Sequence, residues 1–139
     1  MPIDLSRRRA ICTYKIVKHV ISNISDEEIE EAKNKRQELR TICRKLPVLI
    51  QQNSLVTTLM YLSKAKEDEN EEKKRSVNKY LFDEIIEWLK EYTGNDEISN
   101  KDFFVQNICY CNISQYRALT TEAILFANWL KNNVESLIE

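Results

Sequence analysis

The chain has 139 residues, enough for one domain that buries about two thirds of its unfolded surface. One glycine and two prolines are too few for a β-sandwich or barrel, and they exclude glycine-rich phosphate loops and dinucleotide-binding fingerprints. With 42% hydrophobic and 31% charged residues, the composition predicts an all-α protein. We expect a compact single-domain helical bundle of about five to six helices over residues 1–139.

The net charge of −1 conceals alternating basic and acidic blocks. Residues 1–25 carry five bases and one acid, and Thr41–Lys66 carries four bases and no acid, so each block has a net charge of +4. Residues 26–40 have a net charge of −2, and residues 67–100 have a net charge of −6. This asymmetry bears on binding partners rather than on the fold, and it favours docking into a larger anionic assembly.

Neither a membrane span nor a signal peptide is expected. No apolar run approaches the roughly 20 residues that a bilayer requires. The basic Arg7-Arg8-Arg9 run is not followed by the uninterrupted apolar region of a signal peptide.

The first helix is predicted from Ser6 to about Ser22, because apolar residues recur there at steps of three and four. A turn is expected at residues 22–25. Ser25, with Glu28 three residues later, forms a capping box for a second helix. The expected inward positions of the first helix are Ala10, Ile11, Tyr14, Val17 and Ile21.

The second helix should end near Leu46, because the residue before a proline is pushed out of the helical region. Pro47 should then begin a third, central helix that runs to Lys66, since its missing N–H costs nothing at the first helical position. Arg36 falls on the apolar stripe of the second helix and weakens it. Expected inward residues are Ile29, Ala32, Leu39 and Ile42 or Cys43 in the second helix, and Val48, Leu49, Leu55, Val56, Leu59, Met60 and Leu62 in the third.

The remaining chain predicts a charged segment and three more helices. Residues 67–75 contain no apolar side chain, so residues 66–76 are expected to be a solvated loop or a helix extension. A fourth helix is predicted from Ser76 to about Tyr92 with Gly94 as its stop signal. A short helix is expected at Asn100–Asn107, and the last helix should begin at Ser114.

The search for catalytic or metal-binding chemistry yields no candidate. His19 is the single conventional base near neutral pH, and its lysine neighbours favour a surface or capping role. The serines lack a glycine-flanked nucleophile elbow, and the glutamate clusters have basic neighbours three or four residues on. We therefore expect no enzyme, no metal and no cofactor. The cysteines, too irregularly spaced for a zinc site, are expected to be buried and reduced in a cytoplasmic protein; they are Cys12, Cys43, Cys109 and Cys111.

The aromatic residues have two interpretations, core packing and base stacking. Trp88 and Trp129 lie on apolar stripes, so core packing is expected for both. Tyr61, Tyr110 and Tyr116 could stack on nucleobases. Packing in the core or at its edge is the favoured interpretation for these tyrosines.

Several short motifs follow one another along nearly the whole chain. They are Arg9-Ala10, Lys45-Leu46-Pro47, Gln52-Asn53 with Leu55, Ser63-Lys64, Tyr116-Arg117, Thr120, Glu122-Ala123 and Trp129-Leu130-Lys131. As a set they resemble the small subunit of the type III-B CRISPR effector, the Cmr complex. Where that family usually has Asn-Gly-Leu, this chain has Asn53-Ser54-Leu55, and Ser54 suits a continuous helix better than a glycine contact.

The resemblance implies a non-catalytic subunit that stacks, several copies together, along the guide-RNA backbone and lines the groove for target RNA. Its implied partners are the other Cmr subunits, the guide crRNA and the target RNA, with no membrane. Asn53 could bond a phosphate or ribose or be a buried packing residue. By matching position, the implied RNA-binding residues are Arg9, Lys45, Lys64, Arg117 and Lys131.

Two alternatives stay open from the sequence. A helical adaptor that binds only proteins would show no salt-dependent affinity for RNA. A small RNA-processing enzyme would require a clustered acid and base set, for which the sequence gives no candidate.

Overall fold

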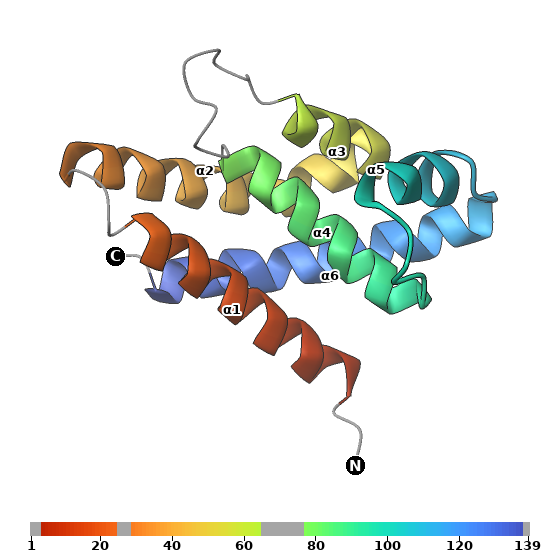
Figure 1. Cartoon of the computed structure of the whole chain (residues 1–139), viewed down its shortest axis with the longest axis horizontal. Coiled ribbons are helices and arrows are strands. Elements are labelled where there is room, and N and C mark those ends of the chain that lie inside the picture. Colours follow the sequence, from red (N-terminus) through yellow and green to blue (C-terminus); the bar gives the residue numbers. More distant parts are fainter. Residues whose placement is uncertain (1–3, 25–28, 65–76, 138–139) are drawn as a thin grey trace. The chain divides into compact units, whose positions relative to one another are not determined.

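The structure, a computed structural model, describes residues 4–24, 29–64 and 77–137. Within these ranges the chain forms six α-helices, one short π-helix and no strand (Figure 1), which confirms the all-α class. The predicted capping box at Ser25 and Glu28 and the charged segment at 67–75 lie outside the described residues. The helices are α1 (Leu5–Ile24), α2 (Ile29–Asn53), α3 (Leu55–Ser63), α4 (Val77–Thr93), α5 (Asn100–Phe103), the π-helix η1 (Phe104–Cys109) and α6 (Ile113–Leu137).

The chain divides into two compact units. The terminal unit comprises residues 1–48 and 125–139, and the central unit comprises residues 49–124. The division falls within α2 and α6. The single domain over residues 1–139 stays a prediction. None of the described helices is both long and apolar enough to cross a membrane.

In the terminal unit, α1 buries a different face from the predicted one. Ile11 and Tyr14 are 44% and 41% exposed, whereas Thr13 is fully buried. Thr13 can be buried because its hydroxyl donates to the Arg9 carbonyl at 2.7 Å and accepts from Asn133 Nδ2 at 2.7 Å. The predicted stripe is therefore wrong by a fraction of a turn. Helix α1 also extends to Ile24, so the turn predicted from Ser22 does not form there. The buried residues of α1 are Arg9, Thr13, Ile16, Val17 and Val20.

Pro47 lies inside α2, so the predicted helix end near Leu46 and the start of a helix at Pro47 are both wrong. A proline in a helix interior removes one hydrogen bond and costs about 3 kcal/mol or more. Leu46 and Ile50 on either side are almost fully buried, and each such side chain contributes about 1.5–3 kcal/mol. Burial of the residues around Pro47 therefore offsets the cost and carries the helix to Asn53.

The break between α2 and α3 occurs at Ser54. Its φ of 84° and ψ of 159° make it the positive-φ non-glycine residue of the described chain. Its hydroxyl Oγ accepts a hydrogen bond from the Thr57 N–H at 3.3 Å and so caps α3. The expectation that Ser54 belongs to a continuous helix is wrong. A residue in this region costs about 1–3 kcal/mol and persists where its surroundings hold it.

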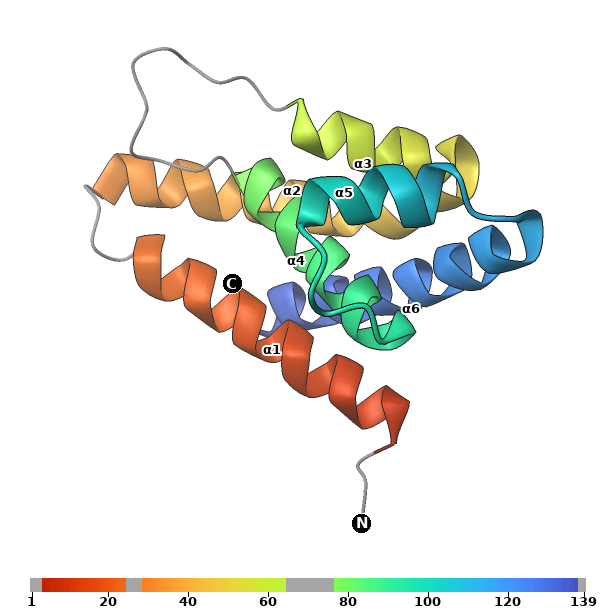
Figure 2. The same ribbon diagram turned by 45° about the vertical axis from the view of Figure 1, so that its right-hand side comes forward.

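In the central unit, α4 packs against α3 and α5 (Figures 1 and 2). Its inward face was largely predicted, and Leu81, Ile85 and Leu89 are almost fully buried. Phe82 also meets Phe104 of η1 edge to face, with ring centroids 5.9 Å apart. These contacts join α4 to three elements of the central unit and make it the helix around which that unit packs.

The predicted stop of α4 at Gly94 is confirmed. Gly94 has a φ of +78°, which a glycine adopts without steric cost. Its N–H donates to the Glu91 carbonyl at 3.2 Å, and the Asn95 N–H donates to the Lys90 carbonyl at 2.9 Å. This pair of hydrogen bonds is the Schellman motif.

A buried hydrogen bond joins α4 to α6. The Trp88 indole Nε1 donates to Glu122 Oε1 at 2.9 Å, and the two residues are 2% and 3% exposed. This contact gives the Glu122-Ala123 motif a structural role, since the Glu122 carboxylate lies in the core of the central unit. Trp88 is thus a core residue, as predicted. Trp129 is only half-buried, so its expected core position is wrong.

The strain at Ser54 gives a paired prediction. Replacing Ser54 by glycine relieves the positive φ and costs only a few tenths of a kcal/mol in capping, so Ser54→Gly should be at least as stable as the parent. Replacing it by alanine keeps the strain and removes the cap, so Ser54→Ala should lose about 1 kcal/mol. Urea unfolding measures both. A glycine variant less stable than the alanine variant would contradict the described break.

A double-mutant cycle tests the buried pair. Trp88→Phe and Glu122→Met each remove the buried hydrogen bond between the two side chains, so each should lose about 1–3 kcal/mol of unfolding free energy. The double variant should lose less than the sum of the two, with a coupling energy of about 0.5–3 kcal/mol from urea unfolding. Additive losses would show that the two side chains do not interact in solution.

Candidate nucleic-acid interface

The two units differ in charge. The terminal unit contains twelve lysines and arginines and nine acids, a net charge of +3. The central unit contains nine bases and thirteen acids, a net charge of −4. Contacts to phosphates are therefore favoured over the terminal unit, and in the central unit they depend on where individual cations lie.

Three of the candidate RNA-binding residues belong to the terminal unit. Lys45 is exposed on α2, and Lys131 is half-buried on α6. Arg9 is only 9% exposed, since it lies on the buried face of α1. Lys45 and Lys131 can thus reach a solvent-exposed phosphate, whereas the Arg9 side chain packs within the protein.

The other three candidates belong to the central unit, and all are exposed. A hydrogen bond from the Val56 N–H to the Tyr116 hydroxyl, 3.2 Å long, joins the first turn of α3 to the first turn of α6. Asn53 precedes Val56 by three residues, and Arg117 follows Tyr116. Two motifs that are about 60 residues apart in sequence therefore meet in one region. Asn53 is exposed there, so its alternative role as a buried packing residue is wrong.

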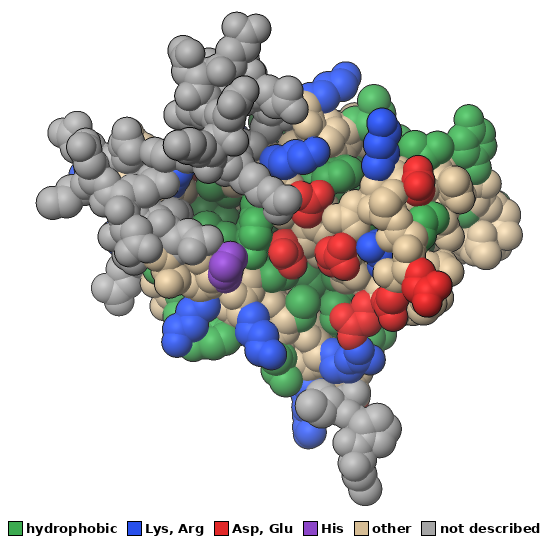
Figure 3. All heavy atoms as spheres, in the orientation of Figure 1, with side chains coloured by type: hydrophobic (Ala, Val, Ile, Leu, Met, Phe, Trp, Pro, Cys, Tyr) green, Lys and Arg blue, Asp and Glu red, His purple; other side chains and the backbone are tan. Residues whose placement is uncertain are grey.

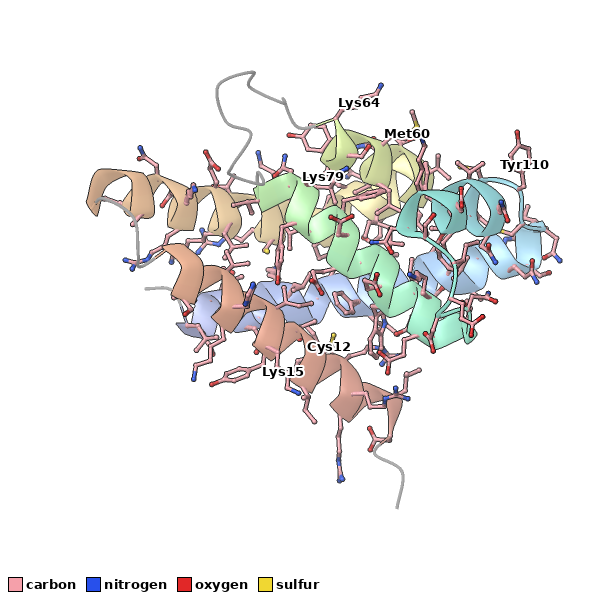
Figure 4. All side chains as sticks on the ribbon, viewed as in Figure 1. Cys12, Lys15, Met60, Lys64, Lys79 and Tyr110 are labelled. Atoms are coloured by element: carbon pink, nitrogen blue, oxygen red, sulfur yellow. The ribbon has the colours of Figure 1, made fainter. Side chains whose placement is uncertain are left out.

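Lys64 lies at the opposite end of α3. It is the C-cap residue, and its backbone N–H donates to the Met60 carbonyl at 3.0 Å. Its side chain extends away from the helix, as does that of Met60 one turn earlier (Figure 4). Nine helical residues span about 14 Å, so Lys64 after α3 and Asn53 at the end of α2 are two separate candidate contact points.

An acidic face limits where a polyanion can lie on the central unit. Acidic side chains gather over α4 and the segment that follows it (Figure 3). Phosphates are repelled by such a face, so an anionic ligand is disfavoured over α4. The acids are Asp83 and Glu84, both half-buried, and Glu87, Glu91, Asp96 and Glu97, all exposed.

The described residues contain no group of three or more His, Cys, Asp or Glu side chains that could hold a metal ion. His19 is exposed on α1, which confirms its predicted surface position. All four cysteines are free, but only Cys43 is buried, so the expectation that all are buried is wrong. Burial raises the pKa of the Cys43 thiol to about 12, which makes it inert. Cys109 ends η1 at the surface, where partial burial and the nearby Cys111 raise its pKa.

The tyrosines differ from one another in their surroundings. Tyr116 packs at the edge of the core and accepts the hydrogen bond from Val56, so its predicted packing role is confirmed. Tyr61 and Tyr110 are 57% and 81% exposed, so the favoured packing interpretation is wrong for these two. Their rings are free of the core and present aromatic faces to solvent.

Sequence reasoning missed one set of cations, the arginines Arg36, Arg40 and Arg44 of α2. Steps of four residues place them along one face of the helix. That spacing is visible in the sequence, but Arg36 is read there as an interruption of the apolar stripe rather than as the first member of a basic row.

The comparison with known families bears on nearly the whole chain. The family described as CRISPR-associated protein (Cas_Cmr5) matches residues 7–137. No curated protein matches the chain. The family match covers both units and every motif named above, so the chain belongs to the Cas_Cmr5 family and is a small subunit of the type III-B CRISPR effector, the Cmr complex.

Proposed function

We propose that this subunit is non-catalytic, acts in the cytoplasm, stacks along the guide-RNA backbone of the Cmr complex and lines the groove for target RNA in antiviral defence. The observation that supports the proposal is the hydrogen bond between Val56 and Tyr116, which joins the start of α3 to the start of α6, where exposed Asn53 and Arg117 are close in sequence to the two bonded residues. An amide and a guanidinium that are exposed beside this helix junction are suited to bind a ribose and a phosphate.

The chemistry of these contacts is independent of base sequence. Lysine and arginine neutralise phosphates and release counterions, which supplies affinity without reading bases. Sequence recognition is left to pairing between guide and target, as in other RNA-guided effectors. The exposed cations Lys45, Lys64 and Arg117 then serve to hold the backbone of the RNA in place.

The charge difference between the units supports the proposed stacking of several copies. A net charge of +3 on one unit and −4 on the other lets the basic unit of one copy attract the acidic unit of another. Each copy adds only a few phosphate contacts, but linked copies act at high effective concentration. RNA binding is therefore a property of the assembly more than of the lone subunit.

A second candidate function is a protein adaptor without RNA contacts. Exposed apolar side chains at the end of η1 and the start of α6 favour it, since Tyr110 and Ile113 are 81% and 67% exposed. Such a surface suits a contact with another protein subunit. The two functions differ in salt dependence, because apolar contacts do not weaken as salt is added.

The absence of catalysis is directly testable. We expect the purified chain to cleave no RNA and to hydrolyse no nucleotide with or without added divalent metal, measured on labelled RNA by gel electrophoresis. Cleavage that persists through stringent purification and is lost on replacing one acidic residue would contradict the proposal.

The groove assignment is tested by the triple variant Lys45→Glu, Lys64→Glu, Arg117→Glu. It should join the Cmr assembly and keep its helical circular dichroism, yet the assembly should lose retention of target RNA, since three phosphate contacts become repulsions. The matched control replaces three other exposed lysines, Lys15, Lys79 and Lys101, by glutamate. Wild-type retention by the first triple variant across the salt range would favour the adaptor.

A further inference from the structure

Helix α2 carries a row of cations that none of the contacts above explains. Lys33, Arg36, Arg40 and Arg44 follow one another at steps of three, four and four residues, so they lie on one face of the helix. Each step of four residues advances about 6 Å along the axis. Lys45 follows Arg44 by one residue, about 100° around the helix, and therefore belongs to a different face.

The row is costly to the isolated helix. Like charges four residues apart destabilise a helix by about 0.2–0.5 kcal/mol per pair. Among the described residues, one acid forms an ion pair with the row: Glu135 of α6 accepts a hydrogen bond from Arg44 Nε at 3.3 Å. That pair is about half exposed, so it contributes little to stability. Within the described part of the chain, no other ion pair accounts for this concentration of arginine.

Arg40 supplies a second, independent observation. Its Nε is buried and has no hydrogen-bond partner among the described residues. A buried charged donor without an acceptor is destabilising, so Arg40 contributes less to the stability of the fold than a fully paired arginine would. The Arg40 side chain as a whole is half-buried, so part of it is accessible from solvent although Nε is not.

We propose that the row of Lys33, Arg36, Arg40 and Arg44 is a phosphate-binding track for the backbone of an RNA strand, distinct from the groove residues Lys45, Lys64 and Arg117. Planar guanidinium groups match phosphate oxygens in a bidentate manner, which lysine cannot reproduce. The regular spacing of these cations along the helix axis suits a ligand whose anionic groups are also regularly spaced. The inference rests on the proposed RNA role of the subunit, and it names a surface of its own.

Glu135 competes with the ligand for Arg44. Its carboxylate occupies Arg44 Nε and places a negative charge beside the end of the track. Replacing it by glutamine keeps the size of the side chain and removes that charge. RNA affinity should then increase, a gain that a merely structural role for Glu135 would not produce.

The experiment uses the full chain reconstituted into the Cmr assembly, with a labelled single-stranded RNA of uridines as the probe. Affinity is measured by fluorescence anisotropy from about 50 to 200 mM salt. The double variant Arg36→Gln, Arg40→Gln should bind about tenfold more weakly at the low-salt end, and its logarithmic salt slope should be shallower by about 1.4, or about 0.7 per lost contact. Glu135→Gln should bind more tightly than the parent.

The matched control is Lys15→Gln, Lys101→Gln, which removes the same charge from exposed positions on α1 and α5. It should leave affinity and slope nearly unchanged. Equal losses in the two double variants would mean that net charge alone matters and would overturn the track. A row variant that fails to join the assembly would overturn the track in favour of an acidic protein partner.

The outcome separates the track from the groove. If the row variant loses RNA and the triple variant at Lys45, Lys64 and Arg117 does not, the track stands and the groove assignment is wrong. The reverse result overturns the track and leaves the groove. If neither variant changes RNA binding, both assignments are wrong and the adaptor function remains.

Discussion

The position of the break between α2 and α3 is the constraint on which the rest of the structure depends. Burial of Leu46 and Ile50 carries α2 through Pro47, and the chain then turns in a single residue, Ser54. A break at Pro47 would shift the start of α3 by eight residues. The Val56 N–H would then no longer donate its hydrogen bond to the Tyr116 hydroxyl. The region that presents Asn53 and Arg117 thus exists because apolar burial outweighs the local preference of proline.

The sequence predicted the fold class and most helices because their signals agree with one another. The stop at Gly94 combines a glycine with the end of an apolar stripe, and the chain reverses there as expected. The prediction failed at Pro47 and Ser54 because turn and proline rules are local, whereas the outcome depended on side chains packed from elsewhere. No rule applied to Ser54 alone places a serine at positive φ.

The candidate site was predictable only in part. The error in the buried face of α1 also accounts for the unexpected burial of Arg9. Thr13 counts as polar in a periodicity argument, but its hydroxyl is satisfied within the terminal unit and so can be buried. That rotates the buried face of α1 and carries Arg9, four residues earlier, inward with it. The exposed positions of Lys45, Lys64 and Arg117 follow from helix periodicity, which is why they agree with expectation.

Two of the free cysteines differ in burial, so their rates of modification by a thiol reagent report different properties of the protein. Cys109 is exposed and open to a thiol reagent at once, whereas Cys43 is fully enclosed in the terminal unit. Modification of Cys43 must wait for that unit to open, so its slow phase reports the free energy of local unfolding. The modification rate of Cys109 gives the intrinsic reactivity of the reagent. The modification rate of Cys43, compared with it in the same chain, gives the frequency of local unfolding.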